Sequence, residues 1–231
     1  MKTIGLLGGM SWESTAVYYR LLNQRIRDEL GGLNSARILL NSLNFAPIEQ
    51  YQREGRWAEA AEQLRQAAQA LQQAGADCLL IGTNTMHKVA DEVQAGLDIP
   101  LLHIAEATAE ALNQRGVSRA GLLGTRFTME ERFYRDKLEQ AGLAVEIPDR
   151  EARSVVDRVI FEELCQGQIH EHSRARFVAI ANDLAERGAE ALVLGCTEIG
   201  LLLRAHDVPL PLVDTTVVHV DAAIDFALGR R

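Results

Sequence analysis

Cysteine is scarce in this chain of 231 residues, and the three that occur share no paired spacing. Cys78, Cys165 and Cys196 are an odd number, without the Cys-x-x-Cys spacing of a zinc site or the even count of a disulfide framework. The six histidines are scattered and add no metal-ligand spacing. The sequence therefore predicts no metal and no disulfide, and it favours a reducing compartment, the cytoplasm.

Long apolar runs and basic clusters are missing as well. No apolar run reaches membrane-spanning length, and Met1 to Thr3 lead straight into a strand-like segment without the apolar region of a signal peptide. The formal net charge of −8 and the lack of a Lys/Arg cluster argue against a nucleic-acid footprint. We therefore expect a soluble protein that binds neither a membrane nor nucleic acid.

Lysine is nearly absent, which bears on cofactors. An enzyme that uses pyridoxal phosphate needs a lysine for its Schiff base. Only Lys2, Lys88 and Lys137 occur, and none has a setting typical of such a lysine. The glycine-rich turn at residues 8–11 could bind a phosphate or carboxylate through its backbone N–H groups, but its spacing is not that of a dinucleotide-binding turn. We expect no cofactor.

The most informative stretch that is present, residues 188–203, has an earlier counterpart in residues 75–87. In each, an apolar run of strand length ends in a glycine and then in polar residues, Thr83 to Thr85 in the first and Cys196 to Glu198 in the second. Two further pairs recur in the same order at an offset of about 110 residues: residues 5–8 with 121–124, and residues 98–101 with 207–210. The sequence therefore predicts two similar lobes.

Strands and helices are expected to alternate along the chain, which is typical of parallel sheets covered by helices on both faces. We expect an α/β fold of two lobes related by a pseudo-two-fold axis, residues 1–103 plus 211–231 and residues 104–210. We expect a fourth strand over residues 99–103, a polar loop over residues 44–55, and a helix starting at a Thr128–Glu131 capping box. Polar residues that follow strands gather at the carboxyl edge of a sheet. Thr83 and Cys196 should then face one another across one active-site cleft between the lobes.

Opposed acid/base groups on two faces of a small molecule suit racemisation or epimerisation. One group removes a proton from a carbon and the other returns a proton to its opposite face. Cys196 can act as a base only as a thiolate, whose pKa neighbours or a helix N-terminus can lower. Glu198 would repel a thiolate, so we expect it to handle a proton, donate or accept a hydrogen bond, or bind a substrate ammonium. We expect His87 to pack against a neighbour and orient it, or to contact the site.

Three motifs resemble the pyridoxal-phosphate-independent aspartate/glutamate racemase family, and the likeness covers nearly the whole chain. They are the Gly-Leu-Leu-Gly-Gly-Met-Ser-Trp-Glu-Ser-Thr opening at residues 5–15, Thr-Asn-Thr-Met-His at residues 83–87, and Gly-Cys-Thr-Glu at residues 195–198. The resemblance implies a homodimeric racemase of aspartate or glutamate, of the enterobacterial broad-specificity or L-aspartate/glutamate-directed branch, with Thr83 and Cys196 as the catalytic residues. It implies an α-carboxylate held around Asn84, Thr85 and Thr197. Further substrate contacts are expected from Met10, Gln52, Arg53, Thr125, Thr128 and Glu198.

Two departures from that family keep alternatives open. Thr83 stands where the family usually has cysteine, and an alcohol is a far weaker acid than a thiol. Cys165 stands where aspartate racemases often have a lysine for the distal carboxylate, so either Arg53 serves instead or the substrate is a neutral amino acid such as homoserine. A decarboxylase or isomerase of small diacids, and an amino-acid-binding protein descended from a racemase, are the other hypotheses.

Overall fold

The computed structural model describes residues 1–230, which form two compact units. Unit 1 comprises residues 1–104 and the described residues from His219 onward, and unit 2 comprises Ala105–Val218. Compared with the predicted lobes, residue 104 lies in unit 1 and residues 211–218 lie in unit 2. There β7 (Leu212–Asp214) pairs in parallel with β6 (Ala191–Gly195), and this pairing holds the segment in the second sheet.

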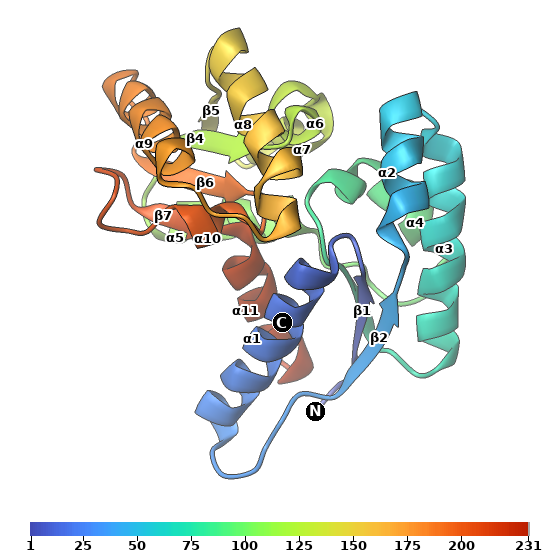
Figure 1. The fold of residues 1–231 in the computed structure, drawn as a ribbon. Helices are drawn as coiled ribbons and strands as arrows, with labels where there is room; N and C mark the ends of the chain where they lie inside the picture. Colours follow the sequence, from blue (N-terminus) through green and yellow to red (C-terminus); the bar gives the residue numbers. More distant parts are fainter. Residues whose placement is uncertain (231) are drawn as a thin grey trace. The chain divides into compact units, whose positions relative to one another are not determined.

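Unit 1 has a three-stranded parallel sheet in the order β2-β1-β3. Its elements, in chain order, are β1 (Ile4–Gly8), α1 (Trp12–Leu30), β2 (Ile38–Ser42), α2 (Phe45–Glu54), α3 (Trp57–Gln73), β3 (Cys78–Ile81), the 3₁₀ turn η1 (Thr85–Val89) and α4 (Ala90–Gln94). In Figure 1, α1 and the end of α11 (Thr215–Ala227) lie on one side of β1 and β2, and α3 lies on the other.

Two apolar clusters cover the two faces of this sheet, because alternate residues of a strand point to opposite sides. Leu6 and Leu80 pack with Tyr18 of α1 and Val220 of α11. Leu7, Leu79 and Ile81 pack on the other face against the alanine-rich stripe of α3. Strands β1 and β3 are buried on both faces, as is typical of a parallel sheet, and the edge strand β2 is only partly buried. The polar side chains that follow β1 and β3 therefore lie at the strand ends.

Unit 2 has a four-stranded parallel sheet in the order β5-β4-β6-β7. Its further elements, in chain order, are α5 (Ile104–Gln114), β4 (Arg119–Gly124), α6 (Arg126–Glu130), α7 (Arg132–Gln140), β5 (Ala144–Glu146), α8 (Arg150–Glu162), the 3₁₀ turn η2 (Leu164–Gln166), α9 (Glu171–Glu186) and α10 (Ile199–Leu202). Leu123, Leu192 and Leu194 pack against α8, α9 and α10 in one cluster. Figure 1 shows α8 and α9 beside β4 and β6.

The strand register repeats between the units. Leu7 is paired with Ile81 in unit 1, and Leu123 with Leu194 in unit 2. The glycine after each pair is required at the same place: a Cβ on Gly82 would lie 3.0 Å from the carbonyl oxygen of Leu7, and one on Gly195 would lie 2.8 Å from that of Leu123. The predicted two-lobed α/β fold with parallel sheets is confirmed. The repeat in the sequence corresponds to the same strand pairing in both units.

Three local predictions were wrong. Residues 99–103 form no strand, because after a single bridge at Leu101 the chain enters α5 within three residues. Residues 45–54 form α2, which Asn44 caps by accepting a hydrogen bond from the N–H of Ala46. In unit 2 the cap belongs to Thr125, which accepts from the N–H of Thr128 and starts α6, so Thr128 and Glu131 form no capping box.

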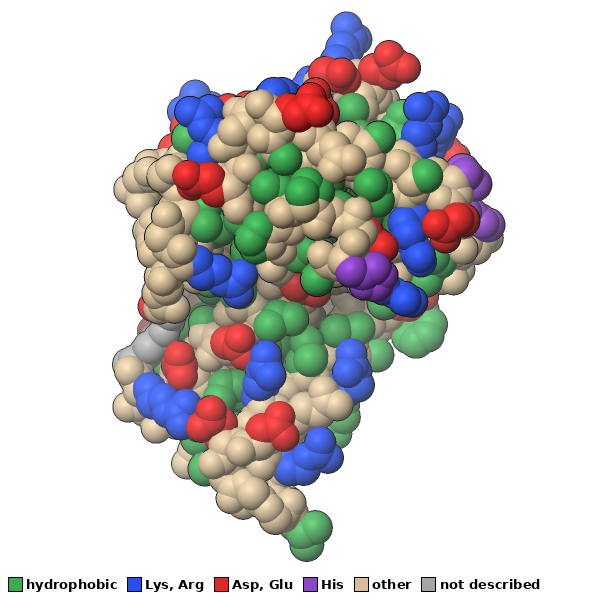
Figure 2. Space-filling view, turned by 90° about the vertical axis from the view of Figure 1, so that its left-hand side faces the viewer, with side chains coloured by type: hydrophobic (Ala, Val, Ile, Leu, Met, Phe, Trp, Pro, Cys, Tyr) green, Lys and Arg blue, Asp and Glu red, His purple; other side chains and the backbone are tan. Residues whose placement is uncertain are grey.

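The surface carries charges of both signs, and Lys and Arg side chains are interspersed with Asp and Glu side chains on the face drawn in Figure 2. One such group joins Arg119 and Arg187 to the two carboxylate oxygens of Glu146, each at 2.7 Å. Within residues 1–230, no helix has both the length and the hydropathy that crossing a membrane requires.

Candidate active site

The end of β6 places a thiol against a carboxylate. Cys196 follows Gly195 directly, and its Sγ donates a hydrogen bond of 3.0 Å to Oε2 of Glu198. The hydroxyl of Thr197 donates to the same oxygen at 2.5 Å. Both Cys196 and Glu198 are buried. One carboxylate oxygen therefore accepts hydrogen bonds from two donors. One donor is the thiol of Cys196, which must lose its proton before Cys196 can act as a base.

This surrounding raises the pKa of Cys196 well above its ordinary value. Burial is the main cause, and the negative charge of Glu198 adds to it. This shift is opposite in direction to the lowering that neighbours or a helix N-terminus can produce in a thiol. The resting side chain is therefore a thiol, and the thiolate that it forms by passing its proton to a nearby acceptor is strongly basic.

The neighbouring strands of unit 2 also end in polar residues. After β4, the hydroxyls of Thr125 and Thr128 lie 3.2 Å apart, and both residues are buried. After β6 and beside it, β7 ends in Asp214, whose carboxylate accepts the N–H of Thr216 at 2.8 Å. Burial raises the pKa of Asp214. Asp214 is not among the site residues predicted from the sequence, although an acid directly after the apolar pair Leu212–Val213 is a usual signal for a strand end.

In unit 1 the turn after β1 is held by hydrogen bonds to the first residues of α1. The N–H of Gly9 donates to Oγ1 of Thr15 at 2.7 Å, and that hydroxyl donates to the carbonyl of Ser11 at 2.9 Å. Ser11 caps α1 by accepting the N–H of Ser14. Met10, one of the predicted contact residues, is buried within this turn.

The other strand end of unit 1 carries the Thr83 motif. Thr83 follows β3 and Gly82, and Asn84 and Thr85 are buried directly after it, where η1 begins. Gln52 of α2 is also buried, and its amide Nε2 donates to Sδ of Met86 at 2.9 Å. The fold thus brings Gln52 to the motif although more than thirty residues separate them in the sequence.

Arg53, the next residue of α2, points the other way. Its side chain is 70% exposed, and its guanidinium lies 3.6 Å from the carboxylate of Glu49. The role expected for Arg53 in binding a distal carboxylate stays a prediction.

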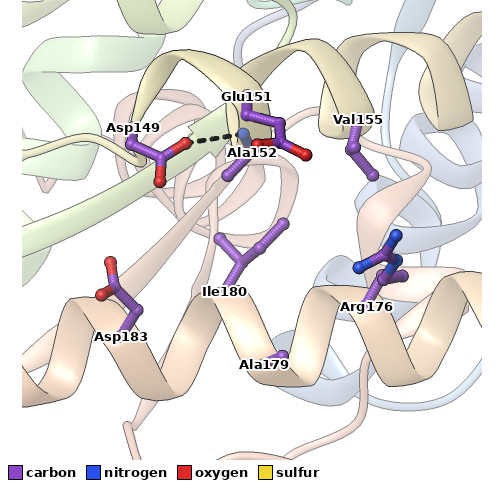
Figure 3. A pocket seen from close by; sticks show the side chains of 8 residues that line it. All are labelled: Asp149, Glu151, Ala152, Val155, Arg176, Ala179, Ile180 and Asp183. Atoms are coloured by element: carbon purple, nitrogen blue, oxygen red, sulfur yellow. Dashed lines mark hydrogen bonds between the residues drawn. The ribbon is translucent and has the colours of Figure 1, made fainter.

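The predicted site residues form no metal site, and they do not line the pocket between α8 and α9. Among residues 1–230 there is no group of three or more His, Cys, Asp or Glu side chains that could hold a metal ion. The pocket has a volume of about 260 Å³ and lies between two helices of unit 2 (Figure 3). It is lined by Asp149, Glu151, Ala152, Val155, Arg176, Ala179, Ile180 and Asp183.

Comparison with known proteins decides the family. The family model described as Asp/Glu/Hydantoin racemase matches residues 7–223. The chain belongs to this racemase family. It is similar to the broad specificity amino-acid racemase RacX of Bacillus subtilis, with 23% identity over 229 residues that cover 99% of both chains.

Solved structures of this racemase family agree over the same span. A candidate Asp/Glu racemase from Yersinia pestis is 50% identical, with a TM-score of 0.93 over 99% of this chain and 100% of that one. An aspartate racemase homologue from Pyrococcus horikoshii OT3 is 34% identical, with a TM-score of 0.86 over 99% and 100%. The resemblance read from the three motifs is therefore confirmed, and the chain is an isomerase of the racemase family that works without pyridoxal phosphate.

Proposed function

We propose that this racemase interconverts the L and D forms of aspartate or glutamate by removing and returning the proton at Cα. The observation that carries the proposal is the hydrogen bond from the buried thiol of Cys196 to the carboxylate of Glu198 in a chain of this family. A thiol whose proton already points at a carboxylate has an acceptor for that proton at the moment when substrate must be deprotonated.

In the proposed reaction, Glu198 takes the thiol proton and the Cys196 thiolate then breaks the Cα–H bond of one enantiomer, which we take to be L. The electron pair is left on Cα and spreads into the substrate carboxylate. The hydroxyl of Thr83 donates a proton to the opposite face. Solvent then reprotonates Thr83, and Glu198 releases to solvent the proton that it took from the thiol, which restores the resting state. Backbone N–H groups and hydroxyls near Asn84, Thr85 and Thr197 would hold the carboxylate, where hydrogen bonds stabilise the extra charge.

The test is isotope exchange with separate substrates. L-aspartate, L-glutamate and L-homoserine are each incubated with the protein in deuterium oxide. We expect deuterium at Cα together with the D enantiomer for aspartate or glutamate. Release of carbon dioxide, or of an isomerised diacid from a diacid substrate, would instead indicate one of the related lyase or isomerase reactions. An absence of exchange with every amino acid would exclude racemisation.

Variants of Thr83 and Cys196 separate catalysis from binding. Thr83→Val removes the hydroxyl at nearly constant volume and should lower the racemisation rate by about 10²-fold or more, whereas Thr83→Ser should retain it within about tenfold. Because the enantiomers have equal free energy, kcat/KM must change equally in both directions. If Cys196→Ala leaves both ligand affinity and biological effect unchanged, the protein is an amino-acid-binding protein and not a racemase in practice.

A neutral amino acid such as homoserine is the second candidate substrate. Two observations favour it: Cys165 occupies the place where a lysine is expected for a distal carboxylate, and the exposed guanidinium of Arg53 already faces Glu49. The relative RacX is itself described as having broad specificity. A higher kcat/KM for L-homoserine than for L-aspartate and L-glutamate would decide for this alternative.

The family resemblance also supports a homodimer that works in the cytoplasm. Light scattering on the purified protein at micromolar concentration tests the first part. A mass near twice 25.5 kDa is expected, and a mass of a single chain at all concentrations contradicts the dimer. Fractionation of the source cells tests the location.

A further inference from the structure

His87 links the backbone of Thr83 to the end of the first segment of unit 1. Its Nδ1 lies 2.8 Å from the carbonyl oxygen of Thr83, and its Nε2 lies 3.2 Å from the backbone nitrogen of Ile104. Ile104 is the residue at which α5 begins and after which the chain leaves unit 1. The ring is almost fully buried.

These two contacts fix the tautomer of the ring. The backbone nitrogen of Ile104 can only donate, so Nε2 of His87 must be the acceptor and carries no proton. A neutral ring then carries its proton on Nδ1, which donates to the carbonyl of Thr83. Burial, together with the neighbouring His103 and His219, holds the pKa of His87 well below its ordinary value, so the ring stays neutral.

The ring is also packed so that it cannot turn freely. The ring centroid of His103 lies 4.6 Å from that of His87, and the centroid of His219 lies 5.7 Å away. His219 is itself held by Tyr18, whose hydroxyl lies 2.8 Å from Nδ1, and by the carbonyl of Leu102, 2.7 Å from Nε2. His87 therefore presents one donor in one fixed direction, toward the peptide that follows Thr83.

We propose that His87 is a positioning residue for Thr83, and that it sets the direction of the Thr83 side chain by holding the carbonyl of the same residue. This inference rests on the proposed function, since it concerns the group that returns the proton on the second face. A shift of the peptide between Thr83 and Asn84 moves the reacting hydroxyl, and small displacements of a reacting group cost rate steeply. Loss of the contact should therefore lower kcat far more than it raises KM.

Two amide variants divide the contacts of the ring. In His87→Asn, the amide nitrogen replaces Nδ1 and can still donate to Thr83, but nothing accepts from Ile104. In His87→Gln, the amide oxygen replaces Nε2 and can still accept from Ile104, but nothing donates to Thr83. We expect His87→Gln to lower kcat about 10- to 100-fold with KM within about threefold, and His87→Asn to stay within about threefold in both.

Tyr18→Phe is the control for general packing, because it removes the hydroxyl bound to His219 and leaves the contact to Thr83. It should lower the melting temperature without the fall in kcat. The reverse order of the two amide variants, or equal falls in kcat that follow equal falls in melting temperature, would overturn the proposal. Thr83→Val tells the two hypotheses apart: if it leaves racemisation unchanged, the proposed role of Thr83 fails, whereas if it lowers the rate and His87→Gln does not, only the positioning role fails.

A measurement on the unaltered protein needs no variant to fold. With ¹⁵N-labelled histidine, nitrogen chemical shifts at pH 7 should show His87 neutral, with the proton on Nδ1. The Nε2–H tautomer, or a charged ring at that pH, would overturn the proposal.

Discussion

The thiol of Cys196 donates a hydrogen bond of 3.0 Å to the carboxylate of Glu198, and its pKa is raised by burial and by that carboxylate. Glu198→Gln removes that negative charge, so the pKa of Cys196 should fall. The racemisation rate should nevertheless fall by about 10²- to 10³-fold, because an amide cannot take up the thiol proton. A lower thiol pKa together with a lower racemisation rate in Glu198→Gln would identify Glu198 as the acceptor of the thiol proton.

Alkylation of Cys196 by iodoacetamide as a function of pH, followed by peptide mass spectrometry, measures the thiol pKa. The matched control is Glu162→Gln on the exposed side of α8, which should change neither the pKa nor the rate. An unchanged rate in Glu198→Gln would leave that carboxylate without a role in proton transfer.

Arg53 provides a test of the substrate's side chain. If its guanidinium leaves Glu49 to bind a distal carboxylate, Arg53→Gln should raise KM for aspartate and glutamate about tenfold or more and leave KM for homoserine unchanged. Steady-state kinetics with the three substrates check this. Arg56→Gln is the control, since Arg56 is also exposed on the surface but is held by Glu54 and Glu59. Equal KM changes for acidic and neutral substrates would argue against the role.

The buried His219 predicts acid sensitivity. Burial lowers its pKa from 6.5 to about 4. Between these values the unfolded chain binds the proton and the folded chain does not, so the free energy of unfolding falls as the pH drops from 6.5 toward 4, by about 3 kcal/mol from this residue alone. The neutral His87 adds a loss of the same sign.

Urea unfolding at a series of pH values measures this dependence. His219→Gln should reduce its slope between pH 6.5 and 4 by up to about 1.4 kcal/mol per pH unit, since one titrating group is removed. His206→Gln, at a side chain that is 73% exposed, is the control for replacing a histidine by glutamine. A wild-type free energy of unfolding that does not change over this window would contradict the assignment of a buried neutral histidine.

Gly195 predicts a combined effect on stability and activity. A Cβ at this position would lie 2.8 Å from the carbonyl oxygen of Leu123, a backbone atom that cannot move aside without shifting β4. Gly195→Ala should lower the free energy of unfolding by about 1 to 3 kcal/mol and displace Cys196, the next residue. Urea unfolding and racemisation assays check both effects. Ser154→Ala on the exposed side of α8 should stay within about 0.5 kcal/mol.

Some features of the fold followed directly from the sequence because they depend on local pattern. Helix α3 (Trp57–Gln73) is an example, since its alanine and leucine stripe has helical spacing. The repeat in the sequence predicted β3 and β6. The glycine after each of these strands lies against the backbone of the adjacent strand, where a larger residue would clash.

Other features depended on contacts that local pattern does not contain. The polar composition of residues 44–55 favoured a loop, yet α2 forms because Ile48 and Gln52 are buried on one side of it. The repeat in the sequence aligned Pro100 with Pro209, but the backbone aligns it with Pro211. The carbonyl of Pro211 accepts the N–H of Leu192 as that of Pro100 accepts the N–H of Leu79.

The motifs indicated the racemase family, and the glycines and apolar runs indicated two similar α/β units and the residues that follow each strand, because these patterns are local in the chain. The positions of two protons, on the thiol of Cys196 facing Glu198 and on Nδ1 of His87 facing Thr83, follow only from the folded structure. Protonation depends on burial and on partners within about 3 Å, and for His87 the deciding partner, Ile104, is brought there only by folding.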